Sequence, residues 1–433
     1  MRGFSLMRAT HILESRTQLP TVGITVSGGG YRAAIFGAGV LNALDGRNSS
    51  SVKKGTGGLL QSATHLAGLS GGSWLVTSLA QANLPTIQHL VLGDGHHLGG
   101  WLPESNLWSP SADPAEQAVF AQEILQELAI KAEHFPLSVG DTWGRALARR
   151  FSNATTSDTF FSNTSHGSGI LFPDLANPSQ RITICAIMAE ILAENTANFS
   201  VLINETYPQP ALRHDTSNYP NPFHSVTPAT FSDSQETVLA LCDGGEDGQI
   251  SPLQPMLVPD RNIDVILAID GTNDADGFAA GASLIATQER MQIFVRGLAA
   301  FPPVPPTLAG FANLTAQPTF FGCLPASHNG YDETRPAGPM LVYLPNGAPS
   351  RDGSPPLTNT STFQETYTAD EMQGMLAQTF TIATQGAEVD GALEDGEWAA
   401  CLACAVVDRA RARQGVKRSG VCGTCFERYC WEG

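Results

Sequence analysis

Residues 63–79 read ATHLAGLSGGSWLVTSL, and the fold can be inferred outward from this stretch. An apolar lead-in ends at Leu66 and Ala67, a glycine-rich turn around Ser70 follows, and a run compatible with a helix opens at Ser73. Gly-x-Ser-x-Gly between a strand and a helix is typical of a nucleophile elbow, whose strained turn exposes the serine oxygen. The pattern alone is weak, because a Gly- and Ser-rich chain also produces it in ordinary turns.

A glycine loop lies upstream of this stretch. The β-branched run 21–26 predicts a buried strand, and it leads through SGGGYRAA at residues 27–34 into an apolar segment of helical character that ends at Leu44. Three glycines at a strand-to-helix junction expose backbone N–H groups, which suit a developing negative charge. The Walker pattern is absent and the glycine spacing fits a dinucleotide fingerprint poorly, so we favour an oxyanion hole.

A third segment, Val238–Cys242, predicts another buried strand and is followed directly by Asp243 and two glycines. An acid at the carboxyl end of a strand points into the crevice where open α/β sheets place their sites. Asp-Gly-Gly is also a common turn sequence. Because the two other segments are present, we favour a functional Asp243.

Together these segments resemble the fungal phospholipase B (lysophospholipase) family, which is related to the catalytic domain of cytosolic phospholipases A and to patatin-like acylhydrolases. The likeness extends to residues 264–270 and to the cysteine-rich end at 425–431, and so runs over most of the chain. It implies an α/β fold with a central, largely parallel sheet, flanking helices, a nucleophile elbow and a cap of helices and loops.

The resemblance also implies a Ser–Asp dyad. In this family pattern Ser70 is the nucleophile and Asp243 is the general base. The backbone amides of Gly29 and Gly30 form the oxyanion hole, and Arg32 meets the substrate phosphate. The chemistry is covalent acyl transfer through an acyl-enzyme.

We expect one catalytic domain over residues 1–433, with a cap or insert at about 95–235 and a disulfide-rich segment at about 398–433. Within the cap, apolar residues at helical spacing predict a helix over 114–134 that begins after the capping residue Asp113. Compared with the family, the stretch before Asp243 is shortened.

The C-terminal cysteines allow two interpretations. Cys401-x-x-Cys404 and Cys422-x-x-Cys425 have the spacing of a zinc ribbon. A further cysteine at Cys430, the glycosylation motifs and the family resemblance favour disulfides, and the sequence does not choose their pairing. We therefore predict no metal site, and none for the pair His96 and His97 either.

The composition of the chain indicates which partners and which cellular location to expect. The net charge of −17 argues against a nucleic-acid partner. No apolar run of membrane-spanning length occurs, and the N-terminus lacks the apolar core of a signal peptide. We nevertheless expect a secreted or cell-surface glycoprotein whose natural product starts further upstream, because eight cysteines accompany seven glycosylation motifs, which start at Asn48, Asn153, Asn163, Asn198, Asn204, Asn313 and Asn359.

The predicted function is hydrolysis of fatty-acyl esters of lysophospholipids, and of phospholipids, at a lipid surface, with no cofactor and no obligate protein partner. Three alternatives stay open, and one of them is acyl transfer between two lipids through the same acyl-enzyme. The shortened middle region would leave a catalytically inactive secreted relative if it had destroyed the site. A conventional Ser–His–Asp esterase would instead use one of the ten histidines, such as His328, as its base.

Overall fold

The computed structural model describes residues 19–134, 137, 139–151, 183–187, 217–221, 223–226, 235–241, 248–293, 298–312, 314–315, 317–323, 338–347, 354–386 and 395–433. Its centre is a six-stranded sheet in the order β3-β2-β1-β6-β8-β7, in which every pairing is parallel except that of β7 with β8. The strands are β1 Val22–Val26, β2 Ala63–Leu69, β3 Thr183–Ile187, β6 Val265–Asp270, β7 Thr319–Phe321 and β8 Met340–Pro345. The predicted α/β class is confirmed.

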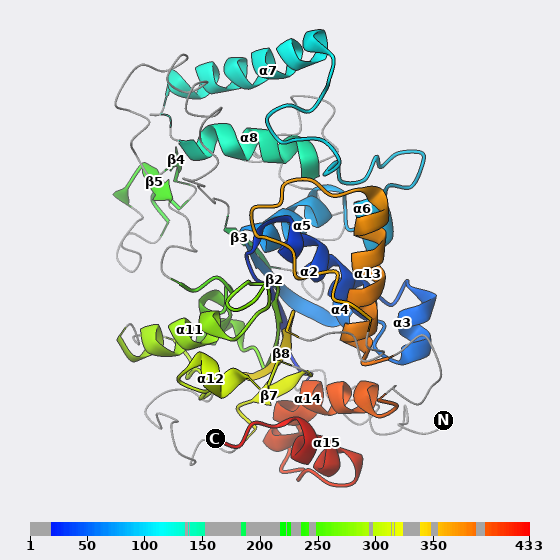
Figure 1. Cartoon of the computed structure of the whole chain (residues 1–433). Coiled ribbons are helices and arrows are strands. Elements are labelled where there is room, and N and C mark those ends of the chain that lie inside the picture. The colour runs from blue at the N-terminus through cyan, green and yellow to red at the C-terminus, as the bar shows by residue number, and fades with distance from the viewer. Residues whose placement is uncertain are drawn as a thin grey trace.

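Both faces of this sheet are buried, which explains why its strands read as nearly continuous apolar runs. Side chains alternate along a strand, so β6 sends Val265, Leu267 and Ile269 into one core and Ile266 and Ala268 into the other. The first core is covered by α2 Gly30–Leu44, α5 Gly71–Gln81 and α13 Ala369–Thr384. The second is covered by α11 Ala282–Ile293, α12 Leu308–Phe311 and the short 3₁₀ helix Gln254–Leu257 (Figure 1).

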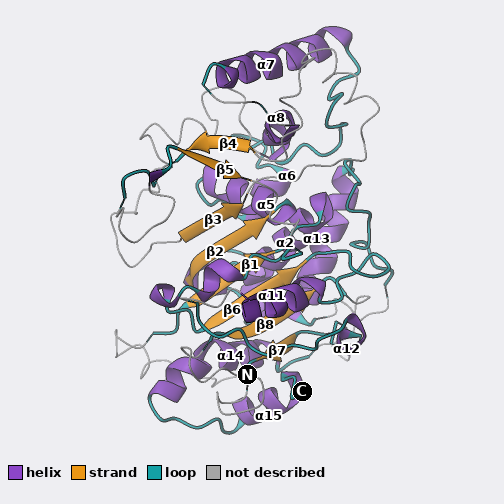
Figure 2. Ribbon diagram, turned by 90° about the vertical axis from the view of Figure 1, so that its left-hand side faces the viewer, coloured by secondary structure: helices purple, strands orange, loops and turns teal. Residues whose placement is uncertain are grey.

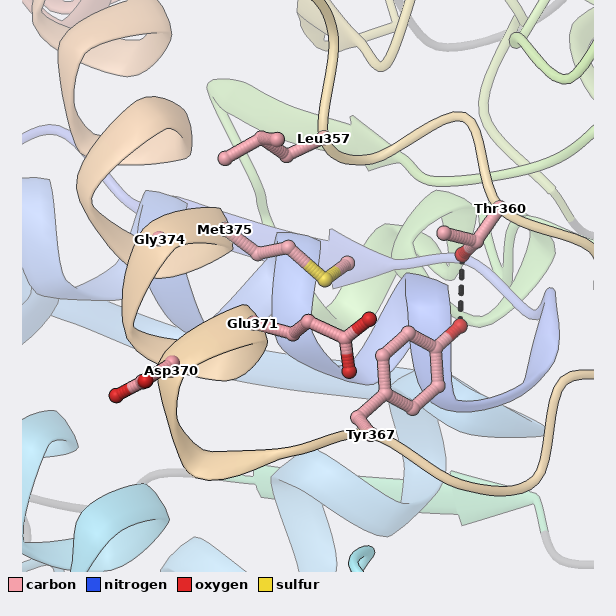
Figure 3. A pocket seen from close by; sticks show the side chains of 7 residues that line it. All are labelled: Leu357, Thr360, Tyr367, Asp370, Glu371, Gly374 and Met375. Carbon is pink, nitrogen blue, oxygen red and sulfur yellow. Dashed lines mark hydrogen bonds between the residues drawn. The ribbon is translucent and has the colours of Figure 1, made fainter.

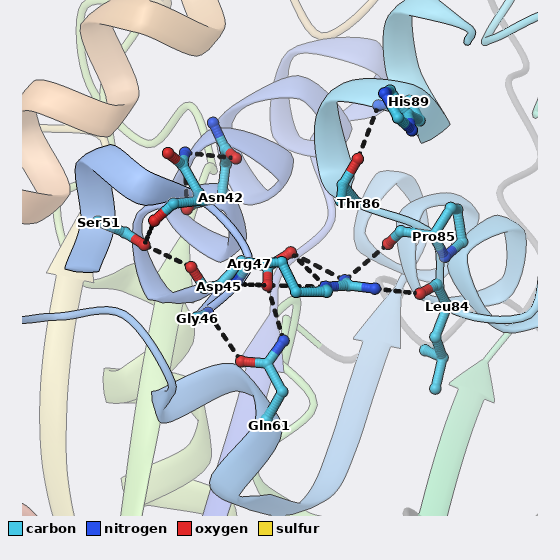
Figure 4. Close-up of polar contacts among 11 residues, drawn as sticks. Asn42, Asp45, Gly46, Arg47, Ser51, Gln61, Leu84, Pro85, Thr86 and His89 are labelled. Atoms are coloured by element: carbon cyan, nitrogen blue, oxygen red, sulfur yellow. Dashed lines mark hydrogen bonds and ion pairs between the residues drawn. The ribbon is translucent and has the colours of Figure 1, made fainter.

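Smaller helices complete the layer beside α2. They are α3 Ser49–Lys54, α4 Leu59–Ser62 and α6 Ile87–Leu92. Polar contacts hold the turn after α2, where the exposed Arg47 donates to both oxygens of the buried Asp45 and to the carbonyls of Leu84 and Pro85 (Figure 4). Asn48 caps α3 and donates through Nδ2 to Asn42 Oδ1 at 2.9 Å, so this glycosylation candidate has a structural role.

The helix predicted over residues 114–134 forms as α7 Pro114–Ala132, with Asp113 accepting from the Ala115 N–H and Pro114 in the first turn. Its apolar stripe is only partly covered, because Ile124 and Leu128 are buried whereas Val119 is 55% exposed. With α8 Val139–Phe151 it lies at one end of the molecule, opposite α14 Trp398–Arg413 and α15 Val421–Tyr429 (Figures 1 and 2).

One strand prediction needs correction. Val238–Leu241 does form a strand, β5, but it pairs antiparallel with β4 Ser217–Pro220 in a separate two-stranded sheet. Val238 and Leu239 are half-buried rather than buried. A short apolar run has the same appearance in a central strand and in a small ribbon, so its sequence does not identify its neighbour.

Disulfides, not zinc, join the C-terminal cysteines. Cys401 pairs with Cys425 and Cys404 with Cys422, which links α14 to α15 twice. Cys323, directly after β7, pairs with Cys430. The zinc alternative is therefore wrong, since all four cysteines of the two Cys-x-x-Cys motifs are oxidised. Among the described residues, no group of three or more His, Cys, Asp and Glu side chains is arranged to hold a metal ion, His96 and His97 included.

Candidate active site

The glycine loop joins β1 to α2 and is held from two sides. The N–H of Gly28 donates to the carbonyl of Ile250, and the Ser27 hydroxyl accepts from the Gly271 N–H at 2.7 Å. Gly29 and Gly30 have φ of 129° and 66°, which only glycine adopts without strain. Among the hydrogen bonds of the described residues, none uses the Gly29 or Gly30 N–H as donor. The two amides predicted to form the oxyanion hole are thus placed at the N-terminus of α2.

The elbow joins β2 to α5, and Ser70 has the strained backbone that such a turn requires. Its φ is 49° and its ψ is −124°, although it carries a side chain. The Ser70 carbonyl accepts from the Ser73 hydroxyl at 2.7 Å and from the Trp74 N–H at 3.0 Å, which fixes the turn onto the helix. The strand–turn–helix context of the predicted nucleophile is confirmed, and the helix begins at Gly71, two residues earlier than Ser73.

The sheet brings the two loops together. β1 and β2 are parallel neighbours, so their carboxyl ends lie at the same edge. The N–H of Gly72 donates to the Ser27 carbonyl at 3.1 Å. A Cβ added at Gly28 would lie 2.9 Å from Ser70 Cβ, and one added at Gly71 would lie 2.1 Å from the Gly30 carbonyl oxygen. Glycine is required at both positions, because a Cβ at Gly28 would clash with the side chains of Ser70 and Ile250, and one at Gly71 would clash with the backbone of Gly30.

Arg32 is fully buried at the foot of this arrangement. Its Nε donates to the Gly271 carbonyl at 3.0 Å, its Nη1 to the Thr360 carbonyl at 2.5 Å and its Nη2 to the Thr362 hydroxyl at 2.9 Å. It therefore ties the glycine loop to residues 354–368, which we call the strap. A Cβ added at Gly30 would lie 2.3 Å from the Thr362 carbonyl oxygen, so the strap lies directly against the glycine loop.

Aromatic side chains surround the elbow, and sequence reasoning missed them. The Tyr31 ring lies 5.5 Å from that of Trp74, 5.1 Å from that of Phe151 and 6.1 Å from that of Tyr367, measured between centroids. Burial raises the pKa of the Tyr31 phenol far above its usual range. These rings come from α2, α5, α8 and the strap. Only Tyr31 and Trp74 lie within the two sequence motifs, so only these two could have been found from the sequence.

Asp243 lies outside the described residues, as do Asn153, Asn163, Asn198, Asn204 and Asn313 among the glycosylation candidates, and His328. The structure does describe Asp270, the other acid that ends a strand. Its Oδ1 accepts from the Thr272 hydroxyl at 2.7 Å, and its Oδ2 accepts from the Tyr343 hydroxyl at 2.8 Å. With both oxygens bonded in a fully buried site, Asp270 has a structural role.

The Asp270 carboxyl makes stability depend on pH. Burial raises its pKa from 3.8 to about 6, with the Asp274 charge adding to the effect and the hydrogen bonds from Thr272 and Tyr343 opposing it. A raised pKa means that its contribution to stability is complete below pH 3.8 and is lost as the pH rises through about 6. Asp270→Asn, neutral throughout, is expected to flatten this dependence.

Urea unfolding of both proteins between pH 4 and pH 7 would measure the effect. The stability of the variant relative to the wild type should rise across this window, by roughly 1.4 kcal/mol for each unit of pKa shift. Parallel stability curves for the two proteins would contradict the assignment.

The family model for the lysophospholipase catalytic domain matches residues 22–169 and 187–433. Lysophospholipase 1 of Aspergillus fumigatus is 30% identical over 506 residues, covering 96% of this chain and 77% of that protein. Lysophospholipase 1 of Candida albicans is 32% identical over 497 residues, covering 96% and 79%. Both alignments are longer than the 433 residues of this chain, so both relatives have residues that it lacks.

A solved structure shows the same fold. Human GIVD cytosolic phospholipase A2 in complex with methyl gamma-linolenyl fluorophosphonate superposes with a TM-score of 0.56 at 16% identity. The match covers 92% of this chain, which spans only 60% of the human chain. None of the described helices is long and apolar enough to cross a membrane. With nearly the whole sequence matched to one family model, the chain belongs to the lysophospholipase catalytic domain family.

Proposed function

We propose that this protein hydrolyses fatty-acyl esters of lysophospholipids, and of phospholipids, with Ser70 as the nucleophile. The observation that carries the proposal is the strained Ser70 turn packed against a glycine loop whose amides lie at a helix N-terminus. A preformed donor pair beside a nucleophile is the arrangement that stabilises the tetrahedral intermediate of acyl transfer.

The reaction has two halves. Asp243 accepts the Ser70 hydroxyl proton while Ser70 Oγ attacks the ester carbonyl, and the amides of Gly29 and Gly30 stabilise the resulting oxyanion. The intermediate collapses, the glycerol oxygen leaves with the proton from Asp243, and the acyl group stays on Ser70. A water then gives a proton to Asp243 and attacks the acyl-enzyme. As the second intermediate collapses, Ser70 Oγ leaves with the proton from Asp243, and the fatty acid is released.

Arg32 is the proposed contact for the substrate phosphate, because a planar guanidinium binds two phosphate oxygens at once. Its Nη1 and Nη2 donate to Thr360 and Thr362 of the strap. A phosphate at Arg32 would therefore take over donors that hold the strap, which implies that the strap shifts when substrate enters.

The remaining proposals concern context. The chain would act as one catalytic domain, with residues at about 95–235 forming a cap near the lipid surface. It would be a secreted or cell-surface glycoprotein. Among its glycosylation candidates, Asn359 is exposed on the strap. The chemistry requires no cofactor, since nucleophile, base and oxyanion donors all come from the chain.

Two measurements test the activity together. Purified protein should release fatty acid from lysophosphatidylcholine, and a serine-directed fluorophosphonate should form one adduct that peptide mapping places on Ser70. A folded protein that shows neither turnover nor adduct would be the inactive relative. Adduct formation at another serine would displace Ser70 as the nucleophile.

A further inference from the structure

A cavity of about 330 Å³ lies between the strap and the first turns of α13 (Figure 3). Its lining comes from Leu357, Thr360, Tyr367, Asp370, Glu371, Gly374 and Met375. Leu357 and Met375 supply apolar walls, and the Tyr367 hydroxyl shares a hydrogen bond of 2.7 Å with the Thr360 hydroxyl. The proposed catalytic roles use none of these seven side chains.

Gly374 keeps this cavity open. It lies inside α13, where its φ is not positive, so the backbone does not require glycine there. A Cβ at this position would meet only Leu357 Cδ1, at 3.2 Å. Glycine inside a helix costs about 1 kcal/mol relative to alanine. The missing side chain thus leaves space in the cavity at the expense of helix stability.

The charge of the cavity is negative. In Figure 3 the Glu371 carboxylate points between Met375 and Tyr367, whereas Asp370 extends away from them. No cationic side chain belongs to the lining. A third acid is close, since Glu104 Oε1 accepts from the Ala369 N–H at 2.9 Å. A carboxylate beside apolar and aromatic side chains suits a small organic cation, such as an alkylammonium group.

The cavity adjoins the proposed phosphate contact through Thr360. Thr360 lines the cavity, and its carbonyl oxygen accepts from Arg32 Nη1 at 2.5 Å. The Tyr367 ring in turn lies 6.1 Å from the ring of Tyr31, the residue after Gly30. In a phospholipid with a choline or ethanolamine headgroup, two methylene groups and one oxygen separate the ammonium from the phosphorus. A phosphate at Arg32 would bring the ammonium to this cavity.

We propose that the cavity binds the ammonium headgroup of the substrate, with Glu371 as the residue that determines headgroup preference. This inference rests on the proposed function. It predicts that substrates with a choline or ethanolamine headgroup are hydrolysed in preference to those without a cation.

Glu371→Gln is the sharp test, because glutamine retains the capping box. In that box Glu371 Oε2 accepts from the Thr368 N–H at 2.8 Å, a bond that an amide oxygen also makes. Glu427→Gln is the matched control, with the same change of charge on an exposed side chain of α15 that does not line the cavity. Both variants and the wild type would be compared on lysophosphatidylcholine and lysophosphatidic acid at equal dilution in neutral detergent micelles.

For Glu371→Gln we expect kcat/KM to fall about fivefold on lysophosphatidylcholine, which corresponds to about 1 kcal/mol for one charge pair, and to stay unchanged on lysophosphatidic acid. Glu427→Gln should leave both values unchanged. An equal fall on both substrates, an equal effect of the two variants, or no effect of Glu371→Gln would overturn the headgroup site. A wild-type protein that hydrolyses neither substrate would instead defeat the proposed function.

Gly374→Ala adds a test in which stability and selectivity move oppositely. The methyl group enters the cavity, so the preference for lysophosphatidylcholine should weaken. The thermal midpoint should not fall, because alanine favours the helix. An undiminished preference in this variant would also overturn the proposal.

Discussion

Ser70→Ala is expected to abolish fatty-acid release from lysophosphatidylcholine, lowering kcat by at least about 10⁴-fold. Loss of a serine nucleophile leaves only the contribution of the oxyanion hole and of substrate binding, and losses of about 10⁶-fold are known for comparable serine enzymes. Alanine keeps the Cβ that lies near Gly28, so the packing between the two loops is preserved. The fluorophosphonate adduct should disappear together with turnover.

The fold must be shown to survive this change. An unaltered thermal midpoint for Ser70→Ala would show that activity is lost without loss of the fold. Ser62→Ala, at the exposed end of α4, is the control for effects of expression and purification on activity. If Ser70→Ala retains turnover well above the uncatalysed rate, Ser70 is not the nucleophile.

The identity of the general base is tested by comparing the same substitution, Asp to Asn, at Asp243 and at Asp270. Asp243→Asn should reduce kcat nearly as far as Ser70→Ala, because an amide does not accept the Ser70 proton. Asp270→Asn should keep activity within about tenfold, since its carboxylate is bonded to Thr272 and Tyr343 and only its charge is removed. Substantial activity in Asp243→Asn would favour the Ser–His–Asp alternative, with His328 as the first histidine to replace.

The parts of the site that could be predicted from the sequence are those encoded locally. The elbow and the glycine loop each combine a strand, a turn and a helix within about a dozen residues, and the need for glycine follows from backbone geometry. The two loops meet because β1 and β2 are parallel neighbours whose carboxyl ends lie at one edge of the sheet, and this pairing is a finding of the structure. Thr368 and Glu371 also form a capping box at the start of α13, which is another pattern encoded within a few residues.

Contacts between residues that lie far apart in the sequence could not be predicted from the sequence alone. Arg32 was identified by its motif, but nothing near it indicates that Thr360 and Thr362 accept its hydrogen bonds. The Asp270–Tyr343 contact depends on the pairing of β6 with β8. The β5 error has the same origin, since its neighbour is chosen by the tertiary fold. Cysteine spacing likewise favoured zinc, whereas the packing of α14 on α15 sets the disulfide pairing.

Removal of the Cys323–Cys430 disulfide is expected to cause the largest loss of stability among the cross-links. It spans 107 residues, whereas Cys401–Cys425 spans 24. In the chain-entropy model, loops of these lengths stabilise by about 5 and about 3.5 kcal/mol respectively. The paired variant Cys323→Ala/Cys430→Ala should therefore have a lower urea midpoint than Cys401→Ala/Cys425→Ala, which serves as the matched control.

Removal of the Cys323–Cys430 disulfide should lower stability without lowering activity. β7 is an edge strand of the order β3-β2-β1-β6-β8-β7, and three strands separate it from β2, which ends directly before Ser70. The Trp431 N–H still donates to the Phe320 carbonyl at 2.9 Å, so the C-terminus retains a contact with β7. In dilute buffer at low temperature the Cys323→Ala/Cys430→Ala protein should keep near wild-type kcat/KM. If the Cys401→Ala/Cys425→Ala protein proves the less stable, contacts between α14 and α15 outweigh loop closure. If kcat/KM falls in the folded Cys323→Ala/Cys430→Ala protein, the edge of the sheet is coupled to the elbow.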